Sequence, residues 1–121
     1  MPTDNITAAT ELSSRLVTDY DANATAEENI AAGATILYQV RVDNRANSGT
    51  VYVKLADATS VTVGTTHPDV IFAATGSKIT SFLIPEGHGF GLGLSFWATS
   101  GSLSSVTSGP GGDVIVHVNC T

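Results

Sequence analysis

The stretch Thr35-Ile36-Leu37-Tyr38-Gln39-Val40-Arg41-Val42-Asp43 shows the clearest pattern in this chain, an alternation of apolar and polar side chains. Successive side chains of a β-strand point to opposite faces, so this alternation predicts a strand that is half buried. The buried face is expected to carry the large apolar side chains and the other face the polar ones: Ile36, Tyr38, Val40 and Val42 against Gln39 and Arg41.

The same pattern continues on the C-terminal side. Polar turn residues occupy 43–49 and alternation resumes over 50–57, which predicts a hairpin. A second hairpin is expected where the runs 69–75 and 78–84 flank Gly76-Ser77, a pair compatible with a type II′ turn. Pro85 to Gly89 is expected to end its second strand. Other strands are expected over 13–18, weakly over 24–30, and over 92–99 and 113–120, with a Ser/Gly/Pro loop over 101–112.

About eight short strands with frequent turn signals predict an all-β fold. We expect a single β-sandwich over residues 13–121, jelly-roll-like, with an immunoglobulin-like sandwich as the alternative. Residues 1–12 lack a sustained period and are expected to form an N-terminal arm. The period of two predicts these core residues: Ile36, Tyr38, Val40, Val42, Val51, Val53, Leu55, Phe72, Phe96, Val114, Val116 and Val118.

Composition agrees with this class and limits the partners. Of the 121 residues 42% are hydrophobic and 13% charged, which is unlike a disordered chain. The formal net charge is −6, with 5 Lys+Arg against 11 Asp+Glu. A nucleic-acid binder or a basic membrane-surface domain needs the opposite balance, so neither partner is expected. Residues 1–12 lack the basic and apolar regions of a secretory signal, and no apolar run has the length of a membrane span.

Groups for catalysis or metal binding are sparse in the sequence. Cys120 is the only cysteine, which excludes an intramolecular disulfide and a site of several thiolates. His67, His88 and His117 have no ligand-like local spacing, and no serine lies in a Gly-x-Ser-x-Gly turn. We therefore expect no enzymatic activity, no cofactor and no metal.

Two aromatic residues are candidates for a subunit interface. If Phe96 points into the core, its neighbour Trp97 points to the other face of the same strand. Trp97 and Tyr52 are then expected to anchor an interface, because aromatic side chains dominate interface energetics. Burial in the core of the opposite sheet and stacking on a ligand remain the alternatives.

A series of motifs between Ile30 and Gly101 resembles a known group of proteins. An asparagine-ended strand, residues 36–44, leads into Ala46-Asn47-Ser48-Gly49 and then Val51-Tyr52-Val53-Lys54-Leu55. Val63-Gly64-Thr65-Thr66-His67-Pro68-Asp69, Ile84-Pro85-Glu86-Gly87 and Phe90-Gly91 follow. This order is similar to small virion structural proteins of tailed bacteriophages, especially those of marine and cyanobacterial hosts, and to capsid decoration (cement) proteins among them.

The resemblance implies a non-enzymatic structural role. Such a protein is expected on the outer surface of the virion head, where it binds the major capsid protein and reinforces the shell. Self-association is expected, as a homotrimer first and a dimer second. The N-terminal arm is expected to lie on a neighbour or on the shell, with Asp4, Asn5 and Ile6 as candidate capsid contacts. The alternative is a tail-associated or host-glycan-binding module.

Overall fold

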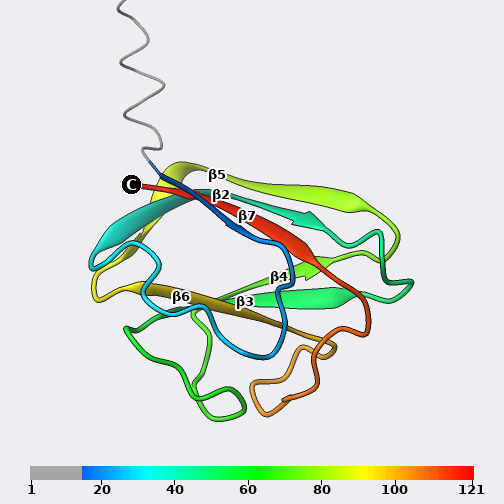
Figure 1. Cartoon of the computed structure of the whole chain (residues 1–121). Helices are drawn as coiled ribbons and strands as arrows, with labels where there is room; N and C mark the ends of the chain where they lie inside the picture. Colours follow the sequence, from blue (N-terminus) through cyan, green and yellow to red (C-terminus); the bar gives the residue numbers. More distant parts are fainter. Residues whose placement is uncertain (1–14) are drawn as a thin grey trace, which may run out of the picture.

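Seven strands and no helix form in residues 15–121, the part of the chain that this computed structural model describes. The density of Val, Ile and Thr explains this, because β-branched side chains favour a pleated surface. The strands are β1 (Arg15–Asp19), β2 (Thr35–Asp43), β3 (Val51–Asp57), β4 (Val70–Ala74), β5 (Ile79–Phe90), β6 (Leu94–Thr99) and β7 (Ile115–Cys120). They form two antiparallel sheets, ordered β1-β7-β2-β5 and β4-β3-β6, that face each other (Figure 1). The predicted all-β sandwich is confirmed.

The segment of residues 23–30, which includes the weak strand expected over 24–30, runs along the edge of β6. Glu27 and Phe96 exchange two backbone hydrogen bonds of 2.8 and 3.0 Å, and the amides of Ala98 and Ile30 extend this pairing at both ends. If this segment is counted as a strand, the second sheet also has four strands. The first strand, β1, then pairs with the last, β7, whereas the immunoglobulin sandwich pairs its first two strands within one sheet. Of the two expected sandwiches, this order favours the jelly roll.

Both predicted hairpins are wrong. β2 and β3 lie in different sheets, and so do β4 and β5. In each case the turn residues carry the chain from one layer to the other instead of reversing it within a layer. Gly76 does not adopt the positive φ that a type II′ turn requires; Ser77 has φ of 63° instead. A Cβ at position 76 would collide with the backbone of Ser48, so only glycine fits between the two crossings.

Asn44, which is fully buried, joins these two crossings. Its backbone amide donates to the Lys78 carbonyl at 2.9 Å and its carbonyl accepts from Ser77 at 3.0 Å. Its side-chain Nδ2 donates to the carbonyls of Gly49, at 3.0 Å, and Ala74, at 3.1 Å. Its Oδ1 accepts from Asn47. The side chain of Asn47 exchanges two further hydrogen bonds with the backbone of Gly112, which brings in the approach to β7.

A β-bulge at Tyr38 changes which residues of β2 face the core. Leu37 pairs with Cys120 and Gln39 with Asn119, so Tyr38 is an extra residue that β7 does not match. Leu37 is therefore fully buried, and the prediction that Ile36 lies in the core is wrong, because 40% of its surface is exposed. Gly87 fits against this bulge with φ of +79°, where a Cβ would lie 3.0 Å from the Tyr38 ring and collide with Ile36.

The rest of the predicted core is largely confirmed. Tyr38 and Phe72 are half buried, and Phe72 packs against the core from its edge. β5 does not end before Pro85 as expected but runs on to Phe90. Because β5 is an edge strand, the missing N–H of Pro85 is tolerated there. The remaining nine predicted core residues are buried: Val40, Val42, Val51, Val53, Leu55, Phe96, Val114, Val116 and Val118.

Replacing Asn44 with alanine should destabilise the fold strongly. The carbonyls of Gly49 and Ala74 and the amide of Asn47 would lose their partner at a buried corner. We expect the free energy of unfolding to fall by about 2–4 kcal/mol, measured by urea denaturation. The control is Asn119→Ala, which removes a half-buried amide that makes no side-chain hydrogen bond within residues 15–121 and should cost less than about 0.5 kcal/mol. Equal effects of the two changes would contradict the role of Asn44.

Candidate functional site

The aromatic pair singled out in the sequence lies on the outer face of the three-stranded sheet. Phe96 is buried in the core, and Trp97 points to the opposite face, as expected. In the register of β3 with β6, Tyr52 lies opposite Thr99 and Lys54 opposite Trp97. Side chains that lie directly opposite share a face, so these four residues form one layer. Trp97 is only 1% exposed and Tyr52 is half buried.

Two loops of the chain itself cover this layer. They are residues 58–69, between β3 and β4, and residues 100–114, between β6 and β7, here called the covering loops. Figure 1 shows both loops on the side of β3 and β6 away from the other sheet. His67 and Ser104 link the loops through a 3.1 Å hydrogen bond, and Gly64 lies so close to Thr107 that a Cβ would meet its Cγ2 at 2.6 Å. The loops therefore close the outer face of this sheet over Lys54 and Trp97, whereas Ile71 of β4, on the same face, is 41% exposed.

Lys54 is fully buried in this layer, although the alternation over residues 50–57 puts it on the face opposite to the core residues Val53 and Leu55. Its Nζ donates a 2.6 Å hydrogen bond to the Leu103 carbonyl in a covering loop, and no ion pair with an acid is found for it in residues 15–121. Burial lowers the pKa of its ammonium group. The neighbouring Trp97 Nε1 is buried without a hydrogen-bond acceptor. The covering loops thus enclose two donors and supply a carbonyl to one of them.

The outer face of the four-stranded sheet differs, because no loop of the described chain closes it. We call it the open face. Residues that the register places on this face alternate with the buried valines of β2 and β7. Two of its leucines are well exposed, Leu16 at 62% and Leu83 at 69%. The open face comprises Leu16, Thr18, Gln39, Arg41, Asp43, Ile79, Ser81, Leu83, Ile115, His117 and Asn119.

A shallow hollow of about 310 Å³ lies at the centre of the open face, where β1, β7 and β2 meet. Arg41 is exposed beside His117, whose Nδ1 lies 3.1 Å from the Thr18 hydroxyl. The hollow is lined by Leu16, Gln39, Arg41, His117 and Asn119. It combines one leucine with a cation, an imidazole and two amides, and its lining contains no Phe, Tyr or Trp ring.

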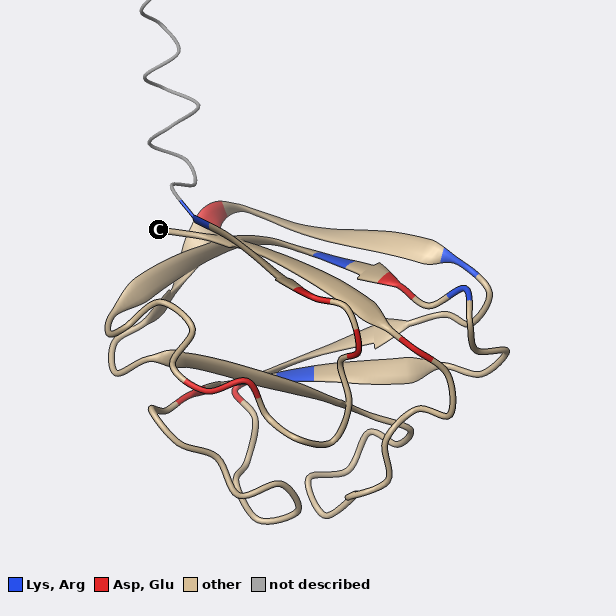
Figure 2. Cartoon of the chain, in the orientation of Figure 1, with Lys and Arg blue, Asp and Glu red and all other residues tan. Residues whose placement is uncertain are grey.

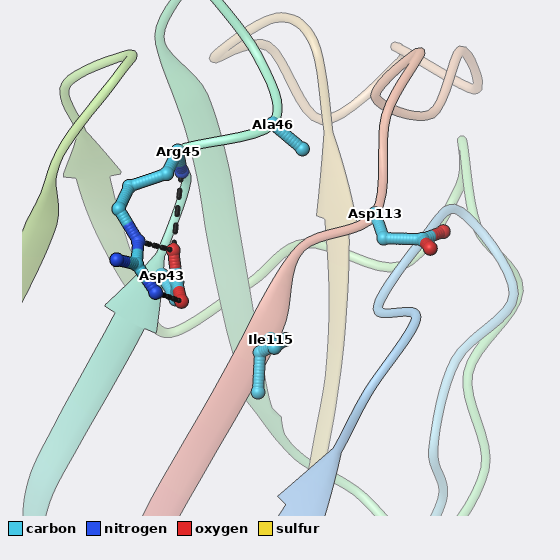
Figure 3. A pocket seen from close by; sticks show the side chains of 5 residues that line it. All are labelled: Asp43, Arg45, Ala46, Asp113 and Ile115. Carbon is cyan, nitrogen blue, oxygen red and sulfur yellow. Dashed lines mark hydrogen bonds and ion pairs between the residues drawn. The ribbon is translucent and has the colours of Figure 1, made fainter.

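A second hollow, of about 420 Å³, lies at the end of the same face (Figure 3). Arg45 folds back onto Asp43 through hydrogen bonds of 3.0 and 2.9 Å, and this contact lowers the pKa of the Asp43 carboxyl. Figure 3 shows the carboxylate of Asp113 turned away from that pair. The Asp43–Arg45 pair neutralises itself, so this hollow offers an apolar floor of Ala46 and Ile115 rather than a charged binding site.

The exposed basic side chains of the described sandwich gather on one layer, whereas acidic side chains lie on both (Figure 2). Four of the five basic residues, Arg15, Arg41, Arg45 and Lys78, lie on the strands of the four-stranded sheet or directly beside them, and the fifth is the buried Lys54. The other layer carries Glu27, Glu28, Asp57 and Asp69. The Asp57 carboxylate accepts hydrogen bonds from the amides of residues 91–93, chiefly Leu92, and these lower its pKa.

The remaining candidates from the sequence lie elsewhere. Asp4, Asn5 and Ile6 are outside the described residues, so their predicted contact with a capsid stays a prediction. The three histidines are far from one another in sheet position: His67 bonds Ser104, His117 bonds Thr18, and His88 packs on the Phe90 ring at 5.1 Å. Residues 15–121 contain no group of three or more side chains that could hold a metal ion, and no helix there could span a membrane.

Sequence reasoning indicated part of this site. It placed Gln39 and Arg41 on the polar face of their strand, and both lie on the open face. It did not indicate that one outer face would be closed by loops and the other left open. No family model, curated protein or solved structure matches this chain.

Substituting Lys54 with methionine should make the free energy of unfolding less dependent on pH in the alkaline range. The folded-state pKa of Lys54 is lowered, so between that value and the unfolded value of about 10.4 the unfolded chain binds more protons. The free energy of unfolding of the wild type therefore gains a contribution as pH rises through this window, and Lys54→Met loses it. At pH 7 the variant should be more stable by about 1–4 kcal/mol, because it removes a buried charge.

The measurement is urea denaturation of both proteins at pH 7 and pH 10. Their difference at each pH cancels every other titrating group, since the two chains differ only at this position. We expect the advantage of the variant to shrink at pH 10. A difference that stays constant with pH would contradict the assignment of Lys54 as a buried ammonium.

Proposed function

We propose that this protein is a structural virion subunit of a tailed bacteriophage that binds the outer surface of the capsid and reinforces it. The observation that carries the proposal is the contrast between the two outer faces of the sandwich. One is closed by the chain's own covering loops, and the other presents exposed leucines around a polar hollow. An exposed sheet face with apolar side chains and a polar centre is suited to a protein partner.

The proposed partner is the major capsid protein, met through the open face. Arg41 and His117 would give the contact its polar specificity, and Leu16 and Leu83 would give it apolar area. Reinforcement follows from mass action: a subunit that binds only the assembled shell stabilises that shell in proportion to its occupancy. Copies of the chain are also proposed to associate with one another. Resemblance to phage virion proteins, stated above from the sequence motifs, supports the location on the head.

The alternative is a tail-associated or host-glycan-binding module. Sugar binding would favour an exposed aromatic side chain beside a groove, because rings stack on the apolar faces of sugars. Trp97 is covered by the chain's own loops, and the central hollow is lined without a Phe, Tyr or Trp side chain. Both observations favour a protein surface over a glycan as the partner of the open face.

The test compares two exposed leucines on opposite sides of the sandwich. Leu16→Glu changes the open face, and Leu103→Glu changes a covering loop at nearly equal exposure, 62% and 68%. Each protein is incubated with virions stripped of the wild-type chain, and the bound fraction is measured by sedimentation. We expect Leu16→Glu to bind roughly 10- to 100-fold more weakly, as for the loss of one buried leucine, and Leu103→Glu to bind like the wild type.

Thermal denaturation of both variants checks that each is folded. Equal binding by Leu16→Glu and the wild type would contradict the open face as the contact. Imaging of virions that carry a labelled chain separates the two locations, since density on the tail would contradict the head assignment.

A further inference from the structure

The side of the sandwich formed by β4 and β5 exposes sheet edges. β4 and β5 are the outermost strands of the two sheets, and in residues 15–121 no further strand pairs with their outer edges. They lie on the same side of the molecule, because the rings of Phe72 and Phe82 meet there at a centroid distance of 4.6 Å. On the opposite side, the edge of β6 is occupied by the segment of residues 23–30.

This edge is apolar along its length. Val70, Phe72, Phe82 and Ile84 are large side chains of β4 and β5 that pack against the core while only partly buried. Leu83, Ile71 and Ile79 are exposed beside them. Residues 70–77 and 79–85 contain no charged side chain. Natural proteins protect a free edge with charges, bulges or proline, and the straight part of β5 before Pro85 has none of these.

The charges that flank this uncharged stretch identify a partner. Lys78 precedes β5 and Glu86 follows Pro85, both are exposed, and each lies four residues from Phe82. If a second β5 pairs antiparallel about Phe82, Ser81 lies opposite Leu83 in the regular part of the strand, and at both ends of the pairing Lys78 of one copy lies beside the bend of residues 84–87 that carries Glu86 of the other. Oppositely charged residues across a strand pair are favourable. Figure 2 shows these charges of opposite sign at the start of β5 and at its bend.

We propose that two copies of this chain pair through β5 about a twofold axis at Phe82, joining their four-stranded sheets into one. A twofold contact of this kind closes with two copies, so it favours the dimer over the homotrimer that the sequence analysis placed first. The second copy would cover the half-buried Phe82 and Ile84. This inference rests on the self-association that the proposed function includes and names the surface that mediates it. It involves no capsid, so it is tested on the purified full chain.

The first experiment reverses the flanking charges and measures the dimer dissociation constant by analytical ultracentrifugation. Lys78→Glu or Glu86→Lys alone places like charges opposite each other twice and should weaken the dimer about tenfold. The double variant Lys78→Glu/Glu86→Lys restores both pairs and should regain wild-type affinity. Asp113→Lys is the control, since it changes the net charge as Glu86→Lys does but lies at the entry to β7, and it should leave the dimer unchanged.

The second experiment tests the register. Directly opposite residues of an antiparallel pair have Cα atoms about 4.5–5.5 Å apart, which suits a disulfide. Ser81→Cys/Leu83→Cys should give a covalent dimer on mild oxidation, and Ser81→Cys alone should not, because its partner position then holds Leu83.

Three results would overturn the proposal: a wild-type chain that is monomeric at millimolar concentration, a trimer, or a dimer that neither single charge reversal weakens. If a peptide of another protein occupied this edge instead of a second copy, the purified wild-type chain would be monomeric, which is the first of these results. If the β5 dimer is not found, the proposed shell binding through Leu16 is unaffected. If Leu16→Glu does not weaken shell binding, the proposed dimer is unaffected, so the two proposals can fail separately.

Discussion

The buried amide of Asn44 is the constraint on which the rest of the fold depends. Two successive strand pairs, β2 with β3 and β4 with β5, must change sheets at the same corner. One side chain with two donors and one acceptor satisfies backbone groups from both crossings, and through Asn47 it reaches the loop before β7. A buried polar group stabilises a structure only when its partners are all present, so this corner forms as a unit or not at all.

That corner also explains why the two outer faces differ. The chain crosses between layers at most turns but stays within the three-stranded sheet from β3 to β4, and its long connections gather around that sheet, where residues 58–69 and 100–114 meet over Lys54 and Trp97. The burial of a lysine there costs free energy, which the loops offset with one carbonyl. Within residues 15–121 no loop covers the four-stranded sheet in this way, and its polar hollow and exposed leucines remain available to a partner.

The two proposals use different surfaces of one scaffold. The open face points away from the core, whereas the edge of β5 lies at its side, so contact with a shell uses side chains and pairing between copies uses the backbone of the outermost strand. Ile79, Ser81 and Leu83 belong to both surfaces, on the open face by their side chains and on the edge by their backbone. A subunit arranged in this way can bind a surface and a neighbour at once, which raises the occupancy of both contacts through effective concentration.

The sequence by itself determined the fold class, the positions of most strands, nine buried core positions and the polar side of β2 and β7, because alternation is a local property that each strand carries in its own residues. Only the tertiary structure decided which strands pair. The turn at 43–49 and the pair Gly76-Ser77 indicate a change of direction equally well for a hairpin and for a crossing between sheets, and the contacts of Asn44 select the crossing. Likewise, one extra residue at Tyr38 exchanged Ile36 for Leu37 in the core, since a bulge shifts the alternation by one position and leaves no mark in the pattern itself. The closing of one face over Lys54 and the openness of the other depend on where two distant loops meet, a contact that no local pattern encodes.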